Sequence, residues 1–113
     1  MKKIKETCPG SSYKVLMDDT LLVDIRETEE YNKVKFDVPH TIHIPFSEFE
    51  NRFQKIPKNK AIIVASYLGE KGKIATKYLL ENGYENVSNM SEGLSKWLHK
   101  RYPVLGDKYF DLR

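Results

Sequence analysis

Short apolar segments alternate along the chain with segments in which apolar residues recur every three or four positions. Residues 21–25 and 61–65 are apolar almost throughout, which is typical of parallel strands covered on both faces. Shorter strands are expected over 41–44 and 87–90. This alternation predicts an α/β fold, with a parallel sheet flanked by helices and right-handed crossovers between the strands.

The segments with helical spacing present their apolar residues on one side. Phe46, Phe49 and Phe53 are three or four positions apart and are expected to pack in the core. Ser47 and Glu50 have the spacing of a capping box, which predicts a helix that begins at Ser47.

Further helices are expected on both sides of the last strand. One begins at about Lys71 and ends at the stop signal formed by Asn82 and Gly83. Thr28 and Ser91 are expected to cap two shorter helices.

The length of 113 residues suits one domain with a single core. Residues 1–10 end in the turn signal Pro-Gly and are expected to be a flexible N-terminal arm. Residues 11–105 contain all the predicted elements and are expected to form the domain. Residues 106–113 are expected to be a C-terminal tail.

Composition narrows the functional class. The 19 Lys and Arg residues against 16 acidic residues give a net charge of +3 without a basic block, so nucleic acid is not an expected partner. No apolar run approaches the ~18 residues that span a membrane, and the basic start lacks the apolar stretch of a signal peptide. The single cysteine, Cys8, fits a reducing compartment. We therefore expect a cytoplasmic protein with no metal site and no cofactor.

The end of the central strand is the expected site. The strand over 61–65 ends at Ser66, and a short loop leads into a helix N-terminus. Backbone N–H groups converge in such a turn and form a cradle for an anion or an activated nucleophile. Ligands of open parallel sheets bind beyond the carboxyl ends of the strands. The pattern alone therefore places the site at Ser66.

Four segments, in order, are similar to signatures of one family. Residues 22–27, Leu-Val-Asp-Ile-Arg-Glu, resemble a strand that ends in Asp-Val-Arg-Glu. Residues 42–49 are similar to Ile-Asn-Ile-Pro-Leu-Ser-Glu-Leu, and residues 83–87 resemble Gly-Phe-Glu-Asn-Val. Residues 93–104 resemble the closing segment of the same family. Together these motifs resemble the rhodanese-like domains, over about residues 12–105.

The resemblance implies a rhodanese-like three-layer fold with a five-stranded parallel sheet. In active members a loop cysteine takes sulfane sulfur from a donor such as thiosulfate and holds it as a persulfide. The loop resembles Cys-Arg-Ser-Gly-Asn-Arg, and the cysteine falls on Ser66. The other five positions are occupied by Tyr67, Leu68, Gly69, Glu70 and Lys71, of which only Gly69 is kept.

Two further positions depart from the family pattern. Residues 37–41 stand where the family has His-Ile-Pro-Gly-Ala and lack its histidine and glycine. Glu92 replaces the first of two glycines near the end, and Gly93 matches the second. The divergence of the whole loop favours natural change over an engineered serine, although the sequence leaves the origin of Ser66 open.

Ser66 decides the expected activity. Persulfide chemistry needs a thiolate, so we expect a binding or regulatory domain without thiosulfate sulfurtransferase activity. One alternative is an active sulfurtransferase that uses Ser66, Cys8 or a partner's thiol. Another is a hydrolase with Ser66 as nucleophile, which needs a base nearby; nothing in the sequence places any of the histidines beside it. A purely structural domain is a further alternative.

Three charged residues near the site, Lys71, Asp24 and Arg26, each have a functional and a structural interpretation. Lys71 keeps a cation where the family has arginine, so it is a candidate to pair with a small anion in the loop; the alternative is a solvated lysine at the helix start. The apolar Tyr67 and Leu68 suit a peptide or a small molecule better than thiosulfate, so a small anion or a protein partner is expected at the loop. Asp24 and Arg26 end the first long strand as supporting polar residues, and an ion pair of Arg26 with Glu30 is the favoured role.

Overall fold

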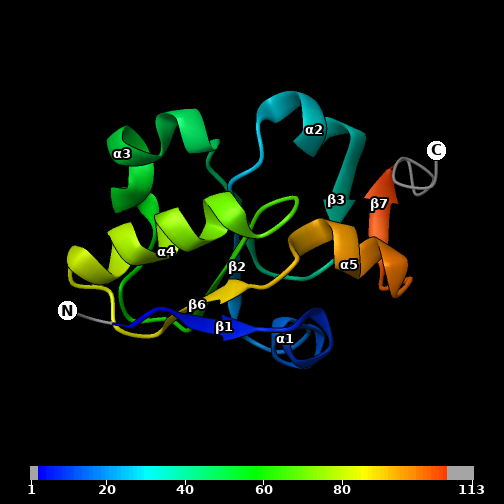
Figure 1. Cartoon of the computed structure of the whole chain (residues 1–113), viewed down its shortest axis with the longest axis horizontal. Coiled ribbons are helices and arrows are strands. Elements are labelled where there is room, and N and C mark those ends of the chain that lie inside the picture. The colour runs from blue at the N-terminus through cyan, green and yellow to red at the C-terminus, as the bar shows by residue number, and fades with distance from the viewer. Residues whose placement is uncertain (1–2, 107–113) are drawn as a thin grey trace.

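The computed structural model describes residues 3–106 and places a five-stranded, fully parallel sheet at the centre of the chain (Figure 1). The strand order is β1-β6-β5-β2-β4. The strands of this sheet are β1 (Lys5–Thr7), β2 (Leu21–Asp24), β4 (Thr41–His43), β5 (Ile62–Ala65) and β6 (Val87–Met90). The predicted α/β class and parallel sheet are confirmed.

Helices cover both faces of this sheet. They are α1 (Pro9–Leu16), α3 (Phe49–Arg52), α4 (Glu70–Glu81) and α5 (Gly93–His99), with single 3₁₀ turns η1 (Phe46–Glu48) and η2 (Phe53–Lys55) around α3. Helix α2 (Thr28–Lys33) buries none of its residues and contacts the segment that follows it. In Figure 1, α3 and α4 lie above β1 and β6, and α1 lies at the lower edge beside the end of β1. A separate antiparallel pair joins β3 (Val34–Phe36) to β7 (Val104–Gly106). No helix of residues 3–106 is both long and apolar enough to span a membrane.

Alternate residues of β5 point to opposite faces of the sheet, which explains its continuous apolar sequence. Ile62 and Val64 pack in the cluster that includes Leu79 of α4. Ile63 and Ala65 pack in the second cluster, which includes Trp97 of α5. The central strand is therefore buried from both sides, and its carboxyl end is held rigidly.

Trp97 organises the second cluster. Its ring meets Tyr13, Phe36 and Tyr102 edge to face, with centroids 5.0 to 5.6 Å apart. Its indole N–H donates a hydrogen bond to the Pro103 carbonyl at 2.9 Å. Trp97 is fully buried and therefore belongs to the core.

Residues 5–7 are not part of a loose arm, as the sequence suggested, but form the edge strand β1. The segment is short and charged, so no apolar pattern marks it as a strand. Its parallel pairing with β6, in which Lys5 is level with Ser88, is what makes it a strand. Of the expected tail, residues 107–113 lie outside the described residues.

The predicted side-chain caps are wrong, because each hydroxyl has another position or partner. Ser47 lies inside η1, and its Oγ donates to Glu27 Oε1 at 2.8 Å across 20 residues of sequence. Thr28 is the first residue of α2 and not its cap. Ser91 Oγ donates to the carbonyl of Thr7. The predicted helix stop is confirmed, since Asn82 is the C-cap of α4.

Candidate functional site

The predicted site lies at the carboxyl edge of the sheet, where β5 and β2 end side by side. Ala65, the last residue of β5, is level with Asp24, the last residue of β2. Ser66 follows Ala65, and the loop reaches α4 at Glu70. Helix α4 thus begins one residue earlier than the sequence suggested.

Ser66 is buried, with 4% of its surface exposed, and its hydroxyl lies in the turn between β5 and α4. The oxygen accepts a hydrogen bond from the N–H of Gly69 at 2.9 Å and one from the N–H of Gly72 at 3.3 Å. The cradle of N–H groups expected from the sequence therefore exists, and the serine side chain itself occupies two of its donors.

Helix α5 and strand β6 hold the loop in place. The N–H groups of Leu94 and Ser95 donate to the carbonyls of Ser66 and Tyr67, both at 2.9 Å. The buried side chain of Asn89 donates to the carbonyl of Gly69 at 3.1 Å. These bonds tie the loop to residues 20 or more positions away, so its shape is a property of the whole fold.

Close backbone approach explains why the glycines at the loop are needed. A Cβ at Gly72 would collide with Asn89 Oδ1, and one at Gly93 would collide with the carbonyl oxygen of Ser66. Gly69 has φ of 101° and lies against the backbone N of Glu92. Glu92 itself has φ of 60°, a left-handed conformation that a side chain of this size rarely adopts.

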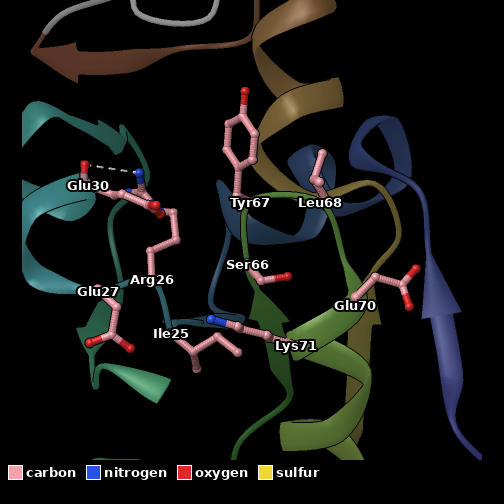
Figure 2. A pocket seen from close by; sticks show the side chains of 9 residues that line it. All are labelled: Ile25, Arg26, Glu27, Glu30, Ser66, Tyr67, Leu68, Glu70 and Lys71. Atoms are coloured by element: carbon pink, nitrogen blue, oxygen red, sulfur yellow. Dashed lines mark hydrogen bonds between the residues drawn. The ribbon is translucent and has the colours of Figure 1, made fainter. Parts of the chain in front are cut away.

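A pocket of about 220 Å³ opens between the loop and the segment 25–30 (Figure 2). Figure 2 shows Tyr67 and Leu68 rising from the loop, while the Lys71 ammonium extends toward the side on which Glu27 lies. Arg26 forms part of the opposite wall. The structure therefore brings all the predicted loop residues except Gly69 to one pocket.

Arg26 pairs with Asp24 and not with the carboxylate of Glu30 as predicted. Arg26 Nη2 lies 2.8 Å from Asp24 Oδ2, and both side chains are almost fully buried. Glu30 contributes only its backbone carbonyl, which accepts from Arg26 Nη1 at 3.3 Å, while Val34 O accepts from Nη2 at 2.7 Å. Asp24 and Arg26 are two positions apart at the end of the strand, which lets their side chains meet on one side.

The histidines do not form a catalytic set with Ser66. His43 Nε2 is 2.7 Å from the carbonyl of Arg26, and its ring stacks on Tyr31 at 3.8 Å. His40 and His99 are exposed. Within residues 3–106, no imidazole or carboxylate is hydrogen-bonded to the Ser66 hydroxyl. The base that a hydrolase of this type requires is therefore missing from the described structure.

Lys71 does not point its charge at Ser66. Its Nζ lies 5.5 Å from the centre of the Phe46 ring, a cation–π contact at the edge of the pocket. The Lys71 ammonium therefore faces the pocket and does not contact the Ser66 hydroxyl, which accepts the N–H groups of Gly69 and Gly72.

Cys8 lies at the same edge of the sheet, directly after β1, as the N-cap of α1. The thiol is exposed. Hydrogen bonds lower its pKa below the ordinary value, chiefly the bond with the Ser11 side chain and then that from the Ser11 backbone. The N-cap role of a cysteine gave no signal in the sequence, because serine and asparagine are the usual residues there.

Sequence reasoning missed three residues of the site. Asn89 was expected only as part of a strand, and because its neighbour Ser88 is polar too, the sequence gives no signal that sets Asn89 apart. Glu27 and Glu30 line the pocket, and no local pattern indicates that they face the loop.

The fold and the site together define the class of protein. It is a three-layer parallel α/β domain whose pocket is lined by a loop between a central strand and a helix. The family model for the rhodanese-like domain matches residues 11–100. The chain therefore belongs to the rhodanese-like domain family.

The relatives include sulfur carriers and sulfurtransferases. The "Putative sulfur carrier protein YrkF" of Bacillus subtilis is 32% identical over 88 residues, which cover 77% of this chain and 46% of YrkF, so the chain spans about half of that relative. The thiosulfate sulfurtransferase GlpE of Haemophilus influenzae is 27% identical, covering 88% of this chain and 93% of GlpE. The polysulfide-sulfur transferase homodimer of Wolinella succinogenes has a TM-score of 0.81 at 26% identity, covering 95% of this chain and 82% of that one.

Proposed function

We propose that this rhodanese-like domain is a binding or regulatory domain that does not transfer sulfur through its loop. The hydroxyl of Ser66 supports this proposal, because it accepts the N–H groups of Gly69 and Gly72 at the position where the family resemblance puts a thiolate. Those donors would lower the pKa of a thiol and stabilise its anion. A hydroxyl ionises far less readily, so the same donors leave it neutral.

The missing step can be written atom by atom. A thiolate attacks the sulfane sulfur of thiosulfate, the S–S bond breaks, and sulfite leaves with the electron pair, which produces a persulfide. Cyanide then takes the outer sulfur as thiocyanate and regenerates the thiolate. Ser66 forms no comparable stable adduct, and in residues 3–106 no side-chain base contacts its hydroxyl.

The experiment compares the natural chain with Ser66→Cys, using Ser66→Ala as the matched control. After thiosulfate treatment, peptide mass spectrometry should find one added sulfur on residue 66 of Ser66→Cys alone. The same variant should gain thiosulfate–cyanide turnover. Turnover by the natural chain that is lost in Ser66→Ala would contradict the proposal.

A second function uses Cys8, and its exposed thiol of lowered pKa supports this alternative. In that case the natural chain should carry one added sulfur on Cys8, and Cys8→Ser should abolish it. The peptide map separates the two functions because positions 8 and 66 fall in different fragments. The single cysteine also suits a reducing compartment, and we propose a cytoplasmic location on that ground.

A further inference from the structure

The side chains around the pocket beside Ser66 carry more negative than positive charge. Glu27 and Glu30 form one wall, and Glu70 lies at the start of α4. Arg26 is already neutralised by Asp24 at 2.8 Å. This leaves Lys71 as the cation of the pocket lining, opposed by the carboxylates of Glu27 and Glu30. The Glu70 carboxylate points away from that wall (Figure 2) and lies 3.9 Å from Lys73 Nζ.

A small anion is therefore a poor ligand for this pocket. Ser66 occupies the N–H groups of Gly69 and Gly72 that would otherwise receive an anion. The Lys71 ammonium lies over the Phe46 ring and extends toward the Glu27 side (Figure 2). An anion that entered would meet the carboxylates of Glu27 and Glu30 on the opposite wall.

The apolar part of the lining suits the stem of a long basic side chain. Ile25 is buried at the base of the pocket, and Leu68 is 61% exposed at its mouth. Lysine and arginine bury a hydrocarbon stem along such surface and keep the charged head beside polar groups. A pocket with apolar walls and a carboxylate side is complementary to that shape and charge.

A second groove next to the pocket indicates that the ligand is a protein segment. This groove is lined by Phe46, Tyr78 and the 59% exposed Ile74. Lys71 and Phe46 lie between the two cavities, since Phe46 lines the groove and contacts Lys71, which lines the pocket. A segment of chain can fill both cavities at once, with a basic residue in one and an apolar residue in the other.

We infer that the pocket binds a lysine or arginine side chain of a basic segment in a partner protein. The inference rests on the proposed binding function and assigns the ligand class of the same site. It replaces the small anion that the sequence suggested with a ligand of opposite charge.

The test is to titrate peptides into the full chain at physiological salt and to monitor binding by the shifts of its amide NMR signals. The probe is a capped six-residue peptide with one arginine among leucine and glycine, and its counterpart has glutamate in place of arginine. The arginine peptide should shift the amides of Leu68, Glu70 and Arg26, and should bind at least tenfold more tightly than the glutamate peptide or thiosulfate.

Two substitutions with opposite expected effects make the test specific. Glu30→Lys should lower the affinity for the arginine peptide at least tenfold, whereas Lys71→Gln should raise this affinity by about threefold. The matched control is Glu29→Lys, which makes the same charge change on the same helix at an exposed residue outside the pocket lining. It should weaken binding less than threefold, because salt screens more distant exposed charges.

If Glu30→Lys and Glu29→Lys lowered the affinity for the arginine peptide equally, Glu30 would act only as a solvent-exposed surface charge, and the inference would be overturned. Saturable thiosulfate binding that Lys71→Gln abolishes would overturn it as well, as would the absence of any saturable peptide shift. These outcomes are independent of sulfur transfer. A chain that carries sulfur on Ser66 overturns the proposed function, whereas one that binds no peptide and carries no sulfur overturns only this inference.

Discussion

Single side chains decide the chemistry of this domain. The oxygen of Ser66 has the same two N–H partners that would polarise a thiolate, yet it cannot become the anion that they stabilise. The surrounding residues have changed too, since Tyr67, Leu68 and Glu70 replace polar and basic residues of the family loop. The proposed loss of sulfur transfer therefore depends on one atom of Ser66, and the proposed change of ligand depends on its neighbours.

The buried pair of Asp24 and Arg26 makes a prediction for stability. Asp24→Asn removes the charge that compensates Arg26, whose side chain is 1% exposed. An uncompensated buried charge costs about 3–5 kcal/mol, so the free energy of unfolding should fall by that amount in urea denaturation. The control is Glu48→Gln in the exposed pair with Arg52, which should cost less than ~1 kcal/mol. Equal losses would mean that burial does not set the strength of the first pair.

The hydrogen bonds of Cys8 allow a prediction of how its alkylation rate depends on pH. The hydrogen bond between Cys8 and the Ser11 side chain is the largest cause that lowers the pKa of Cys8, so alkylation should reach half of its maximal rate at a lower pH than in Ser11→Ala. The sign follows because the depressed pKa moves the reactive thiolate to lower pH. Iodoacetamide labelling reports this residue alone, since the chain has one cysteine. Superimposable profiles for the two chains would refute the role of Ser11.

At the scale of elements, the junction of β6 with α5 fixes the position of the loop. The N-terminal turn of α5 donates two N–H groups to the loop carbonyls, and Gly93 makes this approach sterically feasible. The residue before it, Glu92, adopts a left-handed backbone without being glycine. The family's glycine at this position would adopt it without strain.

Glu92→Gly should therefore stabilise the protein. Relief of a left-handed non-glycine residue contributes about 1–2 kcal/mol, and the added freedom of the unfolded chain offsets about 0.4–1 kcal/mol. We expect a net gain of up to ~1 kcal/mol in the free energy of unfolding, measured by urea denaturation. Glu85→Gly is the control, because Glu85 is exposed and does not have positive φ. It should lose stability, and a loss of the same size in Glu92→Gly would show that no strain is present.

At the scale of the whole molecule, two cores on opposite faces of one sheet hold the site. One core packs under α3 and α4, and the other under α1 and α5. The loop at Ser66 begins on the strand between these cores and is tied to α5 on one side and to α4 on the other. Damage to the second core should therefore reach the loop although Trp97 lies outside the pocket lining.

Trp97→Ala is the corresponding prediction. Truncation of a buried tryptophan costs about 3–5 kcal/mol, measurable by circular dichroism in guanidinium chloride. Hydrogen exchange at the amides of Leu94 and Ser95 should accelerate as the loop contact loosens. Trp97→Phe keeps most of the ring and serves as the milder variant if the alanine chain does not fold. Unchanged exchange at both amides in a destabilised chain would show that the loop is independent of this core.

The sequence predictions are correct where they depend on local patterns and wrong where a contact between distant residues decides the outcome. The strand before Ser66 and the helix stop at Asn82 are local patterns, and both are confirmed. The capping role of Ser47 is wrong because Glu27, 20 residues earlier, takes its hydroxyl. Strand β1 could not be predicted because three charged or polar residues become a strand only when the edge of β6 is available.

The sequence by itself determined four strands of the parallel sheet and the helices between them, the turn in which Ser66 lies, and the absence of a thiol at this position. These depend on periodicity and on residue identity, which are read locally. Only the tertiary structure decided that Asp24 neutralises Arg26, that Ser66 occupies the N–H cradle, and that Glu27 and Glu30 face the loop. Such contacts depend on where crossovers and packing bring chain segments together, and no local pattern specifies that geometry.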